Sequence, residues 1–489
     1  MPRTFALLAA AIVLAQAAVC AQGARKRMSA EEIVRQALAV CAPLRYPRGG
    51  RLPIRASRLE GWIPEDDGEA RALLKQLDER GLAINARWTP GAKQEESLRQ
   101  ALRLGRLQKE LGLGIGVNAT ACMHYFFNGD PRTFHIADDG TPFFDDSFAP
   151  RRKMGCPFAI KFRYPEIKAQ LEYFLRAYKE AGLDIEFIYV DWEIDGPIEW
   201  NDAWAHSKRC VRCRENIPHI EDFREFQRAL RTIRCEIQRE VYAKTVKQYF
   251  PNALVGNYAV YPHDGYRYWY DWFERLPEGA PYKADQRAKY REWFDEFPLT
   301  GYTFAMPVVY TWYPTWGWYD FDVGDYRWFY NMLLVATNVC KSTPADIPII
   351  SWVHWHTTAP REDLPLPDLK QFSEEKYQEL LWHMLLRGCD AFIMWCRPEE
   401  TAKELQLVQE VYAASLEFKE FLDRGQPVLF DVPSRPGPVV SALKLGDRLL
   451  VRRTDFTDDA QPVLCAIAGK EVQIPRAEGR CQLLTLPGG

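Results

Sequence analysis

Two carboxylates separated by one tryptophan end the apolar run "IYVDWE", residues 188–193. Side chains two residues apart in a strand point to the same side, so Asp191 and Glu193 should lie next to each other. Because adjacent carboxylates repel one another, the pair is expected to keep one proton near neutral pH. A carboxylic acid that is still protonated near neutral pH can act as a general acid, and this is the chemistry that the segment indicates.

Strands that alternate with helices are expected to position this pair. Eight apolar, strand-like segments alternate with segments of helical periodicity between about residues 50 and 425, which predicts an α/β fold, a (β/α)8 TIM barrel. The expected strands are Pro53–Ser57, Leu82–Trp88, Ile115–Met123, Ile185–Asp191, Ala253–Val260, Tyr302–Tyr310, Ile347–His354 and Ala391–Cys396. After residue 425 the pattern changes to short alternating strands. We therefore expect a barrel domain at 22–425 and a small antiparallel β domain at 426–489.

Polar and aromatic residues gather where the expected strands end, which is where barrel enzymes place their active sites. The residues expected there are Asp191, Glu193, Asp195, Asn257, Tyr258, Tyr310, Trp312, His354, Trp355, His356 and Trp395. Acids surrounded by aromatic rings fit a glycosidase, because rings stack on sugars and an acid protonates the leaving oxygen. The seventh strand offers no carboxylate before Glu362 to act as a nucleophile. This favours a substrate-assisted scheme, in which an N-acetyl oxygen of the substrate attacks.

Four segments carry a resemblance to a known family. The segment "VDWE" (190–193) resembles the fourth-strand signature of the hyaluronidases and, more loosely, the Asp-x-Glu ending of the chitinase motif. The segments "GNYAVYPHDGYRY" (256–268), "PVVY" (307–310) and "GCDAFIMW" (388–395) are similar to hyaluronidase segments on the fifth, sixth and last strands. The four occur in the order that the family has.

The resemblance implies a role for each matching residue. Glu193 would be the proton donor, and Asp191 would orient the substrate amide. Tyr258 and Tyr310 would hold the N-acetyl group, and Trp395 would form the floor of a sugar subsite. The substrate expected on this basis is a poly- or oligosaccharide that contains N-acetylhexosamine, and the scheme needs no cofactor.

Two other functions fit the same residues. A carbohydrate-binding barrel without catalysis would keep the aromatic residues and would not need Glu193. A metal-dependent hydrolase would use His354, His356, Asp191 and His263 as ligands, and strand alternation places the first two on one face.

The N-terminal segment and the overall charge indicate the cellular location of the protein and its class of partner. Arg3 precedes the apolar segment "FALLAAAIVLAQAAV", and small residues follow, which predicts an export signal cleaved after Ala21. No later apolar run is long enough to span a bilayer. The net charge of −3 gives no reason to expect nucleic acid or an anionic membrane as a partner. We therefore expect a secreted or periplasmic protein whose partner is a carbohydrate.

The cysteines leave one question open. Of twelve cysteines, Cys20 would leave with the signal, and eleven would remain. Cys210 and Cys213 form a CxxC motif in a polar segment. In an oxidising compartment a local disulfide is expected for such a pair, and zinc is the alternative. The long insertion Asn128–Phe162 after the third strand is rich in Phe, Asp, Gly and Pro, and we expect it to be a substrate-side loop.

Overall fold

The computed structural model describes residues 28–124, 126–146, 153–192, 201–258, 293–317, 319, 321–357, 366, 368–477 and 479–487. The expected export signal, Glu193, Asp195 and His263 lie outside the described residues. None of the helices in the described ranges is both long enough and apolar enough to cross a membrane.

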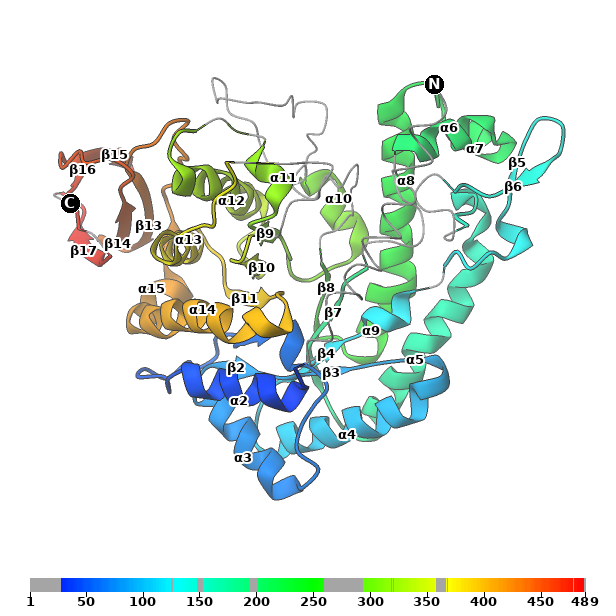
Figure 1. Ribbon diagram of the computed structural model, residues 1–489, viewed down its shortest axis with the longest axis horizontal. Coiled ribbons are helices and arrows are strands. Elements are labelled where there is room, and N and C mark those ends of the chain that lie inside the picture. Colours follow the sequence, from blue (N-terminus) through cyan, green and yellow to red (C-terminus); the bar gives the residue numbers. More distant parts are fainter. Residues whose placement is uncertain are drawn as a thin grey trace.

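Parallel strands form the centre of the molecule (Figure 1). They are β1 (Ile54–Ala56), β2 (Leu82–Ala83), β3 (Asn85–Arg87), β4 (Ile115–Asn118), β7 (Ile185–Val190), β8 (Leu254–Asn257), β9 (Val308–Tyr310), β10 (Ile350–His354) and β11 (Ala391–Met394). One sheet has the order β2-β1-β11-β10-β9 and the other has the order β3-β4-β7-β8. Only Ile84 separates β2 from β3, so the expected second strand belongs to both sheets. Each of the eight expected strand segments contains a strand, which confirms the α/β class.

The two outer strands β8 and β9 approach each other through the chain that leads into β9. The N–H of Thr303 donates to the carbonyl of Val255 over 2.9 Å, and the N–H of Val255 donates to Oγ1 of Thr303 over 2.8 Å. Ala305 forms a parallel bridge with Ile349, next to β10. The segment before β9 therefore touches both neighbours, while a closed barrel stays a prediction.

Helices surround the strands (Figure 1). They are α2 (Ala30–Val40), α3 (Asp67–Asp78), α4 (Gln94–Glu110), α5 (Tyr164–Glu180), α6 (Asn201–Arg209), α7 (Val211–Asn216), α8 (Phe223–Ile237), α9 (Lys244–Tyr249), α10 (Trp293–Thr300), α11 (Tyr313–Trp316), α12 (Gly324–Ser342), α13 (Glu374–Leu386), α14 (Thr401–Ser415) and α15 (Lys419–Arg424). Helix α3 shows why such segments fold. Asp66 caps its first turn by accepting the N–H of Glu69, and Ala70, Leu73 and Leu77 bury one face at helical spacing.

The inner side of β7 carries Phe187 and Tyr189. The guanidinium of Arg55 lies 4.3 Å from the centre of the Phe187 ring. Gly116 of β4 leaves room for this interior packing, since a Cβ at that position would lie 2.1 Å from Oδ1 of Asn85. Trp192 points the other way, toward the surrounding helices, as strand alternation predicts.

The insertion after β4 forms a short hairpin of β5 (His135–Ile136) and β6 (Pro142–Phe143), which lies beside α6 and α7 (Figure 1). The structure does not show the disulfide expected here, and in it Cys210 and Cys213 are both free thiols. The sulfur of Cys213 lies 3.7 Å from that of Cys156 in the insertion, whereas an S–S bond measures about 2.05 Å. The expected substrate-side loop thus packs against the CxxC segment.

Antiparallel strands follow helix α15, as expected after residue 425. They are β12 (Gln426–Pro427), β13 (Val439–Leu445), β14 (Arg448–Thr454), β15 (Val463–Ile467), β16 (Lys470–Ile474) and β17 (Cys481–Thr485). A buried ion pair joins Glu379 of α13 to Arg452 of β14. Nδ1 of His383 also lies 2.7 Å from the hydroxyl of Ser441. This polar contact fixes the strands on α13, and the domain boundary itself stays a prediction.

Candidate functional site

The two residues that follow β7 are held by three other elements. The N–H of Asp191 donates to Oγ1 of Thr120 over 2.8 Å, and the N–H of Trp192 donates to Oδ1 of Asn257 over 3.0 Å. Arg234 of α8 donates to the carbonyl of Trp192 and lies 4.1 Å above the indole ring. The backbone that leads directly into Glu193 is therefore fixed on both sides, as a preorganised site requires.

The side chain of Asp191 lies on the inner side of the strand. Burial raises the pKa of the Tyr189 phenol well above its ordinary value, and the charges of Glu60 and Asp191 raise it further. The Asp191 carboxylate is thus close to an inward-facing phenol two residues earlier in the strand. Asp191 itself is half-buried, so one side of it remains open to solvent.

Four aromatic side chains from the ends of the four strands β8, β9, β10 and β11 contact one another. Tyr310 stacks on Trp395 with ring centres 6.1 Å apart, and its ring centre lies 6.3 Å from that of Tyr258. The His354 ring lies edge-on to both Tyr310 and Trp395, with centres 5.6 and 5.2 Å apart. The structure therefore brings together three of the residues expected to bind substrate, and His354 joins them.

A buried carboxylate from α14 holds the end of β10. Oε1 of Glu404 lies 2.8 Å from Nδ1 of His354 and 2.9 Å from Nδ1 of His356. The Glu404 carboxylate also accepts the backbone N–H groups of Trp355 and His356. Burial alone would raise its pKa, but the bonds with the two histidines outweigh burial and hold it at about 2. Burial opposes the charged form of His356, and Glu404 overcomes that effect, so the pKa of His356 is raised.

His354 also belongs to a group of residues that could hold a metal ion at this end of the strands. Ligand atoms of His354, Glu400 and Glu404 lie within 4.8 Å of one another. This set differs from the expected one, because the partner of His354 is Glu404 rather than Asp191. Glu404 already accepts two backbone N–H groups, which leaves it fewer lone pairs for an ion.

The other expected site residues have different surroundings. Asn257 is buried, and its amide oxygen fixes Trp192, so it positions the site. Trp355 is also buried, and its indole N–H donates to the carbonyl of Phe372 over 2.8 Å. The ring of Trp312 is partly buried next to Tyr313.

Glu60 is a buried carboxylate at the strand ends that the sequence analysis missed. It follows β1, and its side chain is fully buried. Its carboxylate accepts hydrogen bonds from Asn85, Arg87, Asn118 and Tyr189, which come from β3, β4 and β7. The rule that selected Asp191, an acid directly after a strand, does not find Glu60, because the 3₁₀-helix Ser57–Leu59 separates it from β1. No local pattern would have found Glu404, which lies in a helix.

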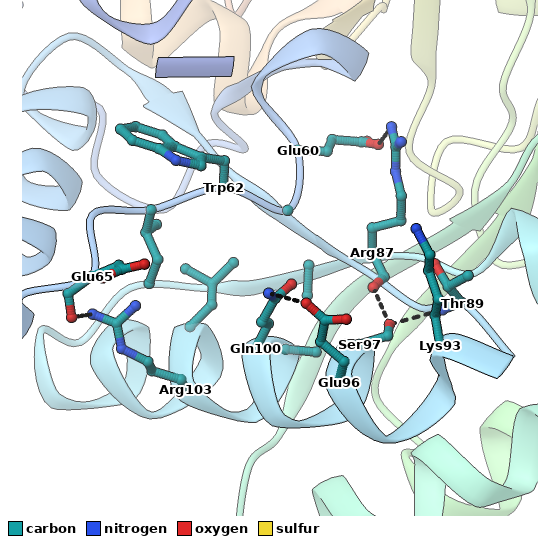
Figure 2. A pocket seen from close by; sticks show the side chains of 15 residues that line it. Glu60, Trp62, Glu65, Arg87, Thr89, Lys93, Glu96, Ser97, Gln100 and Arg103 are labelled. Atoms are coloured by element: carbon teal, nitrogen blue, oxygen red, sulfur yellow. Dashed lines mark hydrogen bonds and ion pairs between the residues drawn. The ribbon is translucent and has the colours of Figure 1, made fainter. Parts of the chain in front are cut away.

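A cavity of about 430 Å³ lies beside the strands, between the chain after β1 and helix α4 (Figure 2). Several of its polar side chains are paired with one another or with the backbone. Arg87 contacts Glu60, Gln100 donates to Glu96, and Arg103 donates to the carbonyl of Glu65. These side chains are occupied by contacts within the protein, so we interpret the cavity as a groove between two packed elements. We place the candidate site at the aromatic cluster instead.

Comparisons with known proteins give similarity in structure only. No protein-family model matches the chain, and no curated protein matches it. Among solved structures, the chain is similar to the GH36 α-galactosidase AgaA from Geobacillus stearothermophilus, with a TM-score of 0.42 and 9% identity over 94% of this chain and 58% of the other. A GH27 β-L-arabinopyranosidase from Geobacillus stearothermophilus has a TM-score of 0.41 and 11% identity, over 86% of this chain and 88% of the other.

A third similar structure is an α-L-fucosidase isoenzyme from Paenibacillus thiaminolyticus, with a TM-score of 0.38 and 11% identity over 86% of each chain. The chain spans less than two thirds of the α-galactosidase. At these identities and TM-scores, what the chain does must be argued from its own site.

Proposed function

We propose that the protein is a glycoside hydrolase whose reaction takes place at the C-terminal ends of the strands of a closed (β/α)8 barrel. Glu193 is the general acid, and Asp191 orients the substrate. The observation that carries this proposal is the clamp on the backbone of Asp191 and Trp192. The aromatic cluster is joined to the same strand end, because the N–H of Tyr258 donates to the carbonyl of Val190 over 2.8 Å and the Tyr258 ring lies beside Tyr310. A fixed acid beside stacking surfaces is what glycosidic bond cleavage requires.

The proposed substrate is a poly- or oligosaccharide that contains N-acetylhexosamine. Its N-acetyl oxygen attacks the anomeric carbon while the glycosidic C–O bond breaks and the proton of Glu193 passes to the leaving oxygen. Water then opens the cyclic intermediate and returns a proton to Glu193. Asp191 supports the amide nitrogen during the attack, and Tyr258 and Tyr310 line the space for the N-acetyl group. We also propose that the protein acts after export, in the periplasm or outside the cell.

The test compares Glu193→Gln with Glu180→Gln, an exposed residue at the end of α5. Initial rates are measured on aryl glycosides with and without an N-acetyl group. Loss of general acid catalysis should lower kcat by about 10²- to 10⁴-fold, with no change in the urea midpoint. The Glu180 variant should keep the parental rate. A parental rate for Glu193→Gln on the best substrate would remove the acid assignment.

A metal-dependent hydrolase is the second candidate, because His354, Glu400 and Glu404 lie close enough to share an ion. It predicts that His354→Gln lowers the metal content of the protein and that added metal restores the activity lost to a chelator. A glycosidase that works through Glu193 keeps its metal content in that variant. A barrel that only binds carbohydrate would bind oligosaccharides and turn over none of the glycosides.

A further inference from the structure

Four buried side chains meet at one point outside the candidate active site. They are His135 of the hairpin after β4, Cys156 of the same insertion, Cys210 at the start of α7 and Cys213 within α7. Their ligand atoms all lie within 4.8 Å of one another. The sulfur of Cys156 lies 3.7 Å from that of Cys213 and 4.0 Å from that of Cys210, and Nδ1 of His135 lies 3.8 Å from the Cys213 sulfur.

We propose that these four residues bind a structural zinc ion. Zinc bound tetrahedrally by thiolates at about 2.3 Å and by imidazole at about 2.0–2.1 Å separates its ligand atoms by about 3.6–3.8 Å. The distances found here are close to these values and far from that of a disulfide. Three sulfurs and one nitrogen favour zinc over magnesium or calcium, which prefer oxygen ligands. Because the protein supplies four ligands and all four are buried, the ion would hold structure and not react.

The surrounding backbone favours thiolates at this point. The N–H of Ile136 donates to the Cys210 sulfur, and the N–H of Phe158 donates to the Cys156 sulfur. A metal ligand must be deprotonated, so these contacts prepare the site for a cation.

The close approach of the two sides of the insertion depends on Gly155. A Cβ at that position would lie 2.4 Å from the carbonyl of Thr133. The same carbonyl accepts the N–H of Cys156 over 2.7 Å. This contact fixes Cys156 near the hairpin that carries His135, and so two ligands from one insertion are brought together before any ion binds.

The proposed ion would stabilise a part of the protein that has little core of its own. The insertion and the helices α6 and α7 share a small hydrophobic cluster that is separate from the main core. Three of the four proposed zinc ligands belong to this cluster. Its buried members are Cys156, Ala203, Cys210, Cys213, Ile217, Ile220, Phe226 and Leu230. Small units of this kind usually need a metal or disulfides to fold.

The position of the ion also bears on the chain that contains Glu193. That chain leaves β7 at the clamp on Trp192 and enters α6 at Asn201. Helix α6 is followed directly by Cys210, so zinc would anchor the second end of the segment. The zinc site stands on its own contacts and does not depend on the proposed glycosidase activity.

The test is metal analysis of the full-length protein, purified without chelators and without added zinc. We expect about one zinc per chain, bound through three thiolates that label only after a chelator removes the metal. Cys213→Ser and His135→Gln should each lose most of that zinc. Cobalt in place of zinc should give thiolate-to-metal charge-transfer absorption, which weakens in Cys156→Ser.

The matched control is Cys41→Ser. Cys41 is also a buried free thiol, and it follows α2 at the opposite end of the molecule from α7 (Figure 1). This variant should keep its zinc, and so should His354→Gln. The proposal is overturned if the parent protein contains no zinc, or if peptide mapping finds Cys210 and Cys213 joined by a disulfide. Equal zinc in the parent and Cys213→Ser would also overturn it. If a variant does not fold, the zinc content and thiol labelling of the parent decide.

Discussion

Replacing Glu404 by glutamine tests how the end of β10 is held. The carboxylate is almost fully buried and keeps contact with His354, His356 and two backbone N–H groups. Glutamine keeps the shape but carries no charge, so the charge-assisted bonds to the histidines are lost. We expect Glu404→Gln to fold and to be less stable than the parent protein.

The size of the effect follows from the pKa of Glu404. Contacts in the folded protein lower it from 4.5 to about 2. That difference corresponds to about 3 kcal/mol of stability, which is present above pH ~4.5 and is lost as the pH falls toward 2. The contribution of His356 to stability has the opposite pH dependence, because its pKa is raised in the folded protein. Its contribution is present below pH ~6.5 and fades as the pH rises through the raised value. The stability difference between parent and variant should therefore be largest near pH 5–6.

The assay is urea unfolding followed by tryptophan fluorescence at pH 5.5 and pH 3. At pH 5.5 the variant should be about 3 kcal/mol less stable, and at pH 3 less than half of this difference should remain. The control is Glu410→Gln, an exposed residue of the same helix, which should change stability by less than about 0.5 kcal/mol. Equal urea midpoints for parent and Glu404→Gln at pH 5.5 would refute the argument.

Two further variants test the site and the C-terminal strands. Asp191→Asn should shift the alkaline limb of the pH profile of kcat/KM and slow N-acetylated substrates more than plain ones, because it removes the charge beside the acid. Profiles that overlay the parent on both substrate types would contradict this. Glu379→Ala leaves the buried Arg452 without its carboxylate and should cost about 3–5 kcal/mol in urea unfolding. Glu420→Ala, which breaks an exposed pair with Arg448, should cost less than about 1 kcal/mol, and equal losses would contradict the burial argument.

Local patterns in the sequence predicted the strands and the direction of their side chains. The alternation in "IYVDWE" predicted that Trp192 turns toward the helices, and it contacts Arg234 there. The predicted strand Ile115–Met123 was too long. The strand ends at Asn118, whose side chain accepts the N–H of Thr120 and turns the chain into a 3₁₀-helix. A short polar side chain redirected a run that was apolar enough to continue as a strand.

Contacts between distant segments could not be predicted in this way. The spacing of Cys210 and Cys213 suggested a local pair, but their nearest partners include Cys156 and His135, which precede them by more than fifty residues. Glu404 is likewise about fifty residues away from the histidines that it holds. In both cases the partner residue comes from a different part of the chain and reaches the site through tertiary packing. The local periodicity of the sequence does not predict such contacts.

The hydrogen bonds of Glu60 bear on which group could act as a nucleophile. An ionised carboxylate has about four lone-pair positions. Asn85 and Tyr189 donate to one oxygen of Glu60, and Arg87 and Asn118 donate to the other. All four positions are therefore in use, and the side chain is shielded from solvent. A nucleophile needs a free lone pair that faces the sugar, so Glu60 holds the strand ends together and does not attack. Among the described carboxylates, this favours attack by the substrate itself over attack by the buried Glu60.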